Sequence, residues 1–310
     1  MTVLDAQMPP KNQPDPATKP SALTELVRDL DLEPLELNLY RGQTQEPGWQ
    51  RVYGGLVLAQ ALAAAMRTVD PDRHAHSMHG YFLLGGQPGT PIIYDVERIR
   101  DGSSFNTRRV KAIQNGRAIF ALNVSFQKRE EGYQHQTEMP DVPSPESLPN
   151  ERELQERYAS HLPENIRSFW GRERPFEMRP IDFSRYLTRE KAAPRQSVWL
   201  RANGRLSDDQ NLHSCLLAYA SDFTLLDTAL IAHGKLLFDT DMQLASIDHA
   251  MWLHAPFRAD DWLLYTQEST FAGGARGFCR GSIYTQSGVL VASVTQEGLM
   301  RKRQTAYTVK

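Results

Sequence analysis

The chain has 310 residues, of which 40% are hydrophobic and 23% are charged, and this composition is typical of a globular protein. The length allows two domains of ordinary size, because a single hydrophobic core usually stops growing at about 250–300 residues. The formal net charge of -2 argues against a nucleic-acid-binding protein, which normally carries a basic excess or a basic stripe.

The N-terminal segment is rich in proline and lacks the basic and apolar regions of a signal peptide, so we expect residues 1–20 to form a disordered leader. The apolar stretches are shorter than the roughly 20 residues that span a bilayer, so we expect no stable membrane association. Cys215 and Cys279 lie in apolar segments and form no disulfide framework or CxxC metal site, which favours a core role. We therefore expect a cytoplasmic protein.

Two long segments have helical character and are apolar on nearly every side, one at residues 54–66 and the other at residues 213–230. A helix that is apolar all round is expected to be enclosed by other elements and not to lie on a surface. The sequence therefore predicts two helices that are each wrapped by a sheet.

Strand signals follow each of these helical segments. After the first, alternating residues 91–99 precede two runs, 108–114 and 118–126, which are joined by Asn115-Gly116. Asn-Gly between apolar runs is a strong hairpin signal, because a type I′ turn needs positive φ at both central residues. After the second, Ser287-Gly288 takes the same place between residues 281–285 and 289–295, which indicates a second antiparallel meander.

The two strand regions are copies of one another. The offset between matched residues is 170–172, which is too long for a solenoid repeat and fits duplicated domains. The matches are His79 with His249, Tyr94 with Tyr265, Glu97 with Glu268, Gln114 with Gln286, and Gly116 with Gly288. We therefore predict an N-terminal domain at 21–130, a partly ordered connection at 131–180 with an amphipathic stretch near 150–158, and a C-terminal domain at 181–310.

Three polar residues of the second copy are candidates for chemistry. Asp222 interrupts an apolar helical segment, where a carboxylate is costly to bury unless it is hydrogen-bonded or used as a base, although it could instead cap a break in the helix. Ser246 is expected to open a strand across the helix, and Gln296 is expected to end the last strand. From pattern alone, each of these two could equally be an ordinary strand-end residue. The amide of Gln296 could hold a water and a carbonyl oxygen together.

Other motifs are weaker. Asp248 and His249 are adjacent, which invites a catalytic-triad interpretation, but the sequence has no GxSxG nucleophile elbow and a histidine in a β-run is more often structural. No GxGxxG, Walker, HExxH or paired-histidine motif occurs, so we expect no metal site.

Several segments closely resemble the acyl-CoA thioesterase II family. They are VYGGLVLAQAL and PIIYDVERIRDGSSFNTRRVKAIQNG in the first half, and SDFTLLDTAL, IDHAMWLHAPF and GGARGFCRGSIYTQSGVLVASVTQEG in the second. The resemblance implies an α+β fold, the double hot-dog, in which two helix-wrapped antiparallel sheets are fused. It also implies hydrolysis of medium- to long-chain fatty acyl-CoA without a cofactor, by Asp222, Ser246 and Gln296. Ser246 stands where many bacterial members have threonine, and either residue supplies a hydroxyl.

The first copy is expected to have lost this catalytic set. Gln60 lies roughly at the helix position of Asp222, and Phe126 or Val124 lies near the position of Gln296. We therefore expect one working site per chain, at the groove between the halves, with Gln60 and Gly55 binding substrate. Pairing of such chains into a homo-oligomer, a dimer or a tetramer, is also expected.

Two other functions remain open at this point. A hot-dog enoyl-CoA hydratase or dehydratase would need an acid and a histidine along the helix, but the second segment offers no histidine after Asp222 until His233. A non-catalytic acyl-CoA-binding module would not need the polar trio. Within the hydrolase hypothesis, a water activated by Asp222 and direct attack by Asp222 to form an anhydride are both possible.

Overall fold

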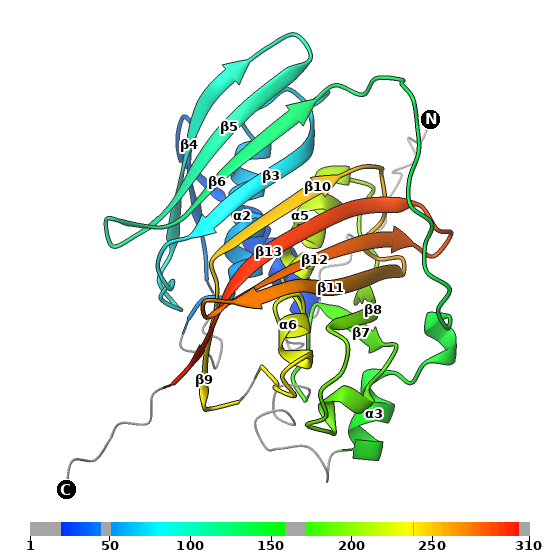
Figure 1. Cartoon of the computed structure of the whole chain (residues 1–310). Helices are drawn as coiled ribbons and strands as arrows, with labels where there is room; N and C mark the ends of the chain where they lie inside the picture. Colours follow the sequence, from blue (N-terminus) through cyan, green and yellow to red (C-terminus); the bar gives the residue numbers. More distant parts are fainter. Residues whose placement is uncertain (1–19, 45–50, 159–170, 238, 304–310) are drawn as a thin grey trace, which may run out of the picture.

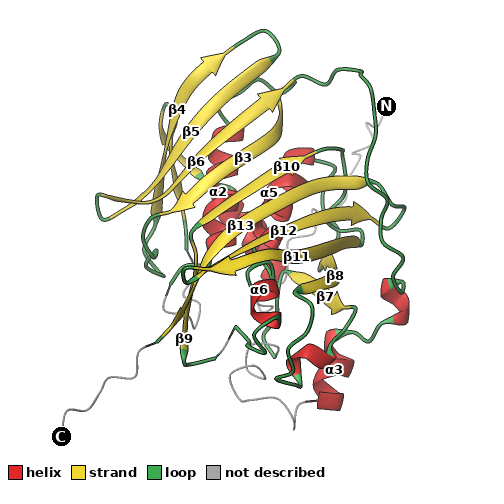
Figure 2. Ribbon diagram, viewed as in Figure 1, coloured by secondary structure: helices red, strands yellow, loops and turns green. Residues whose placement is uncertain are grey.

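The computed structural model describes residues 20–44, 51–158, 171–237 and 239–303, so residues 1–19 of the expected leader lie outside the description. In these residues thirteen strands form one antiparallel sheet, and two helices, α2 and α5, lie side by side against one face of it (Figure 1, Figure 2). The α+β double hot-dog expected from the sequence is therefore confirmed, as a single sheet that is continuous across both halves.

The first half of the sheet curves around α2 (Gly54–Met66), with α1 (Ala22–Leu30) packed beside that helix. Its strands are β1 (Glu33–Glu36), β2 (Leu39–Gly42), β3 (His74–Phe82), β4 (Ile92–Asp101), β5 (Phe105–Gln114) and β6 (Arg117–Gln127). Between β5 and β6, Asn115 and Gly116 both have positive φ, as the predicted hairpin turn requires.

The second half repeats this plan around α5 (Gln210–Ser221) and the short α6 (Asp227–Ile231). Its strands are β7 (Phe176–Pro180), β8 (Arg195–Ala202), β9 (Met242–Ser246), β10 (Asp248–Leu253), β11 (Leu263–Gly273), β12 (Arg276–Thr285) and β13 (Leu290–Lys302). Most predicted strands are shorter than the observed ones, because polar residues on the outer face hide the ends of each strand from a hydrophobicity pattern.

The strand order is symmetric about the seam between the two halves. It runs β1-β2-β4-β5-β6-β3-β10-β13-β12-β11-β8-β7, so β3 and β10 meet at the centre. There His79 lies opposite Ala250, and Gly80 lies opposite His249. The two halves are thus related by an approximate twofold axis that passes through the His79–Ala250 pair.

The ladders fix the equivalence of the two halves residue by residue. Tyr94 pairs with Ala112 in the first half, and Tyr265 pairs with Ile283 in the second. Each of these hairpins contains a bulge at the same distance from its tyrosine, so equivalent residues of the two hairpins are 171 positions apart. Along β3 and β10 the same offset makes Met78 the equivalent of His249. The predicted match of His79 with His249 was therefore wrong by one residue, and the two side chains lie on opposite faces: His249 is buried and His79 is exposed.

The two central helices cross at close range. Every residue of α2 after Gly54 is buried, which explains its apolar composition. The helices run antiparallel, with Met66 near Cys215 at one end and Gly54 near Asp222 at the other. A Cβ at Gly55 would lie 2.3 Å from the carbonyl oxygen of Tyr219, so only glycine allows this approach.

The helix predicted at residues 213–230 was wrong in its extent. It breaks after Ser221, and Asp222 is the C-cap residue of α5. Thr224 then adopts a φ of 58°, which is strained for a β-branched residue, before α6 begins. The alternative interpretation of Asp222, as a residue at a helix break, describes its backbone correctly.

The chain between the halves lies along the outer face of the second half of the sheet (Figure 1). Its Met139, Val142 and Leu148 pack on Trp199 and Trp262, and the indole N–H of Trp199 donates to the carbonyl of Pro143 at 2.9 Å. The predicted amphipathic stretch contains α3 (Glu151–Tyr158). Among the described residues, no helix is long and apolar enough to cross a membrane.

Candidate active site

Three candidate residues from different elements meet at one point. Asp222 is at the C-terminal end of α5, Ser246 is the last residue of β9, and Gln296 lies on the inner face of β13. Two details of the prediction were wrong. Ser246 ends a strand and does not open one, and β13 does not end at Gln296 but continues to Lys302. Both strands run alongside each other here, with Ser246 opposite Gly298.

The amide of Gln296 links the other two side chains. Its Nε2 donates to Asp222 Oδ1 at 2.9 Å and to Ser246 Oγ at 2.6 Å. Ser246 Oγ lies 3.5 Å from Asp222 Oδ1, which is at the limit of a hydrogen bond, so the hydroxyl proton is available to another acceptor. The Gln296 side chain is completely buried, whereas Asp222 and Ser246 are half-buried. A small ligand can therefore reach the carboxylate and the hydroxyl together.

Burial raises the pKa of Asp222 from its ordinary value to about 6. Hydrogen bonds from Gln296, from the backbone N–H of Gly55 and from Ser246 act in the opposite direction and keep the rise moderate. Asp222 is consequently ionised at neutral pH but is a stronger base than a solvated aspartate. This is the range in which a carboxylate works as a general base.

The start of α2 brings the first half of the chain into the site. The first N–H groups of a helix have no partner within it, and that of Gly55 points at Asp222. A Cβ at Gly54 would lie 2.8 Å from Asp222 Oδ2, so the second carboxylate oxygen faces this helix end. Residues from both halves of the chain therefore surround this candidate site.

Aromatic side chains adjoin the carboxylate. Tyr53 stacks on Phe223, with 5.5 Å between ring centroids, and Tyr219 packs edge-on against both rings. The hydroxyl of Tyr53 donates to the carbonyl of Tyr219, and Phe82 approaches Gly54 from the other side. Tyr53, Phe82 and Phe223 are partly exposed and form an apolar border to Asp222. No sequence motif distinguished these three residues from core aromatics.

Gln60 is completely buried and its hydrogen bonds are internal. Its Nε2 donates to the carbonyls of Asp29 and Gln43, and its Oε1 accepts from the Tyr94 hydroxyl at 2.7 Å. The matched Tyr265 donates to the carbonyl of Ser221, so Gln60 occupies a place close to that of Asp222. Its role in substrate binding, like that of Gly55, stays a prediction.

The adjacent pair Asp248 and His249 does not form a triad. Asp248 accepts a hydrogen bond from the backbone N–H of Glu297 at 2.6 Å, whereas the His249 ring points to the other face of the sheet, towards Ser221. Within the described residues, His, Cys, Asp and Glu side chains form no group of three or more that could hold a metal ion.

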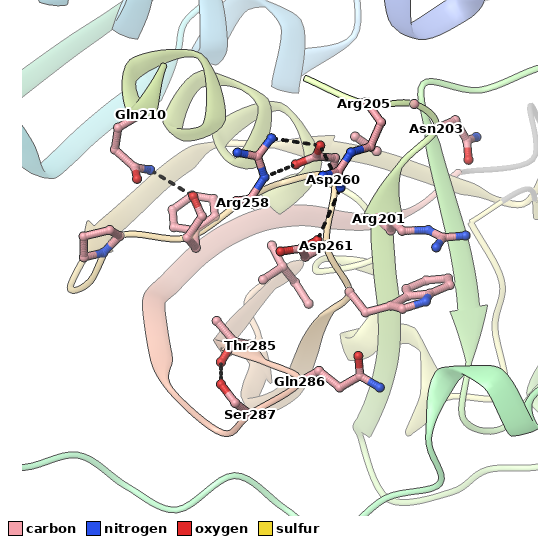
Figure 3. Close-up of a pocket in the computed structure, with 16 residues that line it drawn as sticks. Arg201, Asn203, Arg205, Gln210, Arg258, Asp260, Asp261, Thr285, Gln286 and Ser287 are labelled. Atoms are coloured by element: carbon pink, nitrogen blue, oxygen red, sulfur yellow. Dashed lines mark hydrogen bonds and ion pairs between the residues drawn. The ribbon is translucent and has the colours of Figure 1, made fainter. Parts of the chain in front are cut away.

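A separate pocket of about 990 Å³ lies beside the N-terminal end of α5 (Figure 3). Arg201, Arg205 and Arg258 line it, but Asp260 and Asp261 line it as well, and the Arg258 guanidinium is paired with Asp260 at 3.0 Å. Arg201 is paired with Glu177. The cations of this pocket are therefore neutralised by carboxylates, and none of the three site residues lines it.

Comparisons with known proteins agree with this architecture. A family model described as acyl-CoA thioesterase matches residues 167–299, and one described as the acyl-CoA thioesterase N-terminal domain matches residues 45–127. Acyl-CoA thioesterase 2 of Haemophilus influenzae is 41% identical over 90% of this chain and 98% of its own length. Acyl-coenzyme A thioesterase 8 of Homo sapiens is 41% identical over 88% of this chain and 87% of its own length.

A solved structure agrees in the same way. The crystal structure of an acyl-CoA thioesterase II, TesB2, from Mycobacterium marinum is 43% identical in sequence and has a TM-score of 0.75. The alignment covers 90% of this chain and 99% of that one. Both halves and their order along the chain are thus shared with this relative.

Proposed function

This chain belongs to the acyl-CoA thioesterase II family and is a thioester hydrolase, and we propose that it hydrolyses medium- to long-chain fatty acyl-CoA at Asp222, Ser246 and Gln296. The observation that carries the proposal is the convergence of these side chains: the Gln296 amide contacts both others at 2.6–2.9 Å. The start of α2 adjoins them. This arrangement suits the activation of one water molecule beside a carbonyl group.

In the proposed reaction, Asp222 accepts a proton from a water while the water oxygen bonds to the thioester carbon. The Ser246 hydroxyl holds that water in place, and the Gln296 amide, which donates to both Asp222 and Ser246, fixes these two side chains around it. The carbonyl oxygen becomes an oxyanion, which an N–H group at the start of α2 stabilises. The C–S bond then breaks, and the departing thiolate takes up the proton held by Asp222. A base contributes about 10²–10⁴-fold and an oxyanion donor about 10²–10³-fold to such reactions.

The fatty acyl specificity is supported by the aromatic border of the site. Tyr53, Phe82 and Phe223 offer partly exposed apolar surface next to Asp222, whereas a small polar acyl group would leave these rings in water. Burial of each methylene of an acyl chain contributes about 0.8 kcal/mol. We expect activity to rise with acyl length until the apolar surface is covered.

The test is thiol release from acyl-CoA substrates of increasing length, with the Asp222→Asn variant as the matched comparison. We expect release from palmitoyl-CoA and a loss of at least about 10³-fold in Asp222→Asn with the fold intact. Hydration of crotonyl-CoA without CoA release would favour a hydratase instead. Binding without turnover would favour a binding module.

A single turnover in ¹⁸O-water separates direct attack by water from an anhydride intermediate. Direct attack places the label in the fatty acid alone. Label in the Asp222 carboxylate would show that this side chain had attacked the thioester itself.

We also propose that the protein is cytoplasmic and forms a homo-oligomer. The homo-oligomer is supported by three exposed apolar side chains at the end of β3, those of Tyr81, Leu83 and Leu84. Light scattering of the purified chain tests it, and a monomer at micromolar concentration would contradict it.

A further inference from the structure

His249 is a buried titratable residue that borders the catalytic trio without belonging to it. It lies on β10, next to Ala250, and Ala250 pairs with Thr295 of β13. His249 and Gln296 are therefore neighbours across the ladder, and both side chains are completely buried on the inner face of the sheet.

Each of these two side chains has one polar atom that is buried without a hydrogen-bond partner. In His249, Nε2 lies 2.9 Å from Ser221 Oγ, and Nδ1 is buried without a hydrogen-bond partner. Gln296 Oε1 is also buried without a hydrogen-bond partner, because only the amide nitrogen faces Asp222 and Ser246. Burial lowers the pKa of His249 to about 4, although the Gln296 amide acts to raise it, so the ring is neutral at physiological pH.

A neutral imidazole carries one N–H, so its tautomer decides how the amide is held. With the proton on Nδ1, the ring can donate to Gln296 Oε1, on the neighbouring side chain across the ladder, and can accept at Nε2 from the Ser221 hydroxyl. With the proton on Nε2, Nδ1 and Gln296 Oε1 are both acceptors and both stay unsatisfied inside the protein, which is unfavourable. Ser221 Oγ also lies 2.9 Å from the carbonyl of Ala218, so its hydroxyl has an alternative acceptor and does not itself fix the tautomer.

We propose that His249 is a positioning residue: its Nδ1–H holds Gln296 Oε1 and thereby turns the amide nitrogen towards Asp222 and Ser246. The reverse orientation of the amide would place its oxygen against the Asp222 carboxylate. This inference rests on the proposed function, because it assigns His249 a role only through Gln296.

The first half of the chain supplies an internal control. The ladder equivalents of His249 and Gln296 are Met78 and Val124, which are both buried. The same fold therefore needs no polar pair at these two places. The histidine and the glutamine are present together in the half that carries Asp222 and absent together from the other half, as expected if they act as a unit.

The test is a double-mutant cycle of His249→Met with Gln296→Ala, read as kcat and KM for palmitoyl-CoA. His249→Met introduces the residue of the equivalent place in the first half. We expect it to lower kcat by about 10- to 100-fold with KM changed less than about threefold. In the Gln296→Ala background the same change should alter kcat less than about twofold. If the loss of kcat in the double variant equals the product of the two single losses, the residues act independently and the proposal is overturned.

Two further measurements keep the proposal falsifiable if His249→Met folds poorly. His249→Asn places an amide N–H near the position of Nδ1 and should recover most of the lost kcat, whereas His249→Gln places it near Nε2 and should not. ¹⁵N NMR of the wild-type protein should show a neutral His249 with its proton on Nδ1, and a proton on Nε2 would overturn the proposal. If Gln296→Ala keeps full activity, the proposed function fails; if it does not but His249→Met is harmless, only the role of His249 fails.

Discussion

The two halves of the chain share a fold but differ at each position of the site. With the offsets fixed by the ladders, Ser246 is equivalent to Ala75 and Gln296 is equivalent to Val124. Gln60 occupies a place close to that of Asp222. The first half fills these positions with two apolar side chains and an internally bonded amide. The polar residues of the second half are therefore not required by the architecture, which favours a chemical role for them.

The helices differ in a second respect that concerns the site. At the start of α2 the N–H of Gly55, which has no partner within the helix, binds Asp222. If Gln60 is superposed on Asp222, the residues of α5 that match Gly54 and Gly55 are Leu216 and Leu217, which lie inside the helix. Their N–H groups are used by the helix itself. The first half thus lacks both a carboxylate and a helix end at its equivalent place, which supports the proposal of one site per chain.

After the loss expected for Asp222→Asn, the largest effect is expected from making the second half resemble the first. Gln296→Val removes the amide that links Asp222 and Ser246, and we expect kcat to fall about 10²–10³-fold. The matched control is Val124→Ala, which should cost about 2 kcal/mol of stability but leave kcat within about threefold. Thiol release and thermal unfolding of both variants measure this. Equal losses of kcat would mean that the difference between the halves does not locate the chemistry.

A smaller effect is expected at the contact between the halves. In Gly54→Ala the new Cβ lies 2.8 Å from Asp222 Oδ2 and 3.1 Å from Phe82, so the carboxylate must shift. A shift of this size costs about 10- to 100-fold in kcat. Gly132 has open space around it, and Gly132→Ala serves as the control with unchanged kcat. An unaffected Gly54→Ala enzyme would show that the start of α2 does not constrain the base.

The pH profile gives a graded test of the same carboxylate. Asp222 must be ionised to accept a proton, so kcat/KM should be constant at high pH and fall tenfold per unit as the pH drops below about 6. In Gln296→Ala the loss of a hydrogen bond that lowers this pKa should move the midpoint upwards. A midpoint near 4 in the wild-type enzyme would identify Asp222 as a solvated carboxylate and contradict the proposed site.

Most of the fold could be predicted from the sequence, because an apolar helix and strands with alternating side chains each give a recognisable hydrophobic pattern. The sequence located α2 at its observed bounds and both hairpin turns. It gave the break after Ser221 only as an alternative to a continuous helix, because the strained φ of Thr224 is held by tertiary contacts, including Gln267 Nε2 at 2.8 Å. The pairing of His249 with Gln296 also depends on strand register, and the repeat alignment matched His249 with His79, one residue away from its ladder equivalent Met78.

The smallest effect is a change in stability. Burial raises the pKa of Asp222 to about 6, so the folded state holds this proton more tightly than the unfolded state. Ionisation of Asp222 therefore destabilises the fold increasingly as the pH rises from about 4 to about 6. The cost is nearly absent at pH 4 and reaches at most about 3 kcal/mol above pH 7. Asp222→Asn keeps the shape without the charge, so its melting temperature should exceed that of the wild type by several degrees at pH 8 and by progressively less as pH falls towards 5. A difference in melting temperature that does not change with pH would mean that the charge of Asp222 is solvated, and the comparison between the halves would then lose its physical basis.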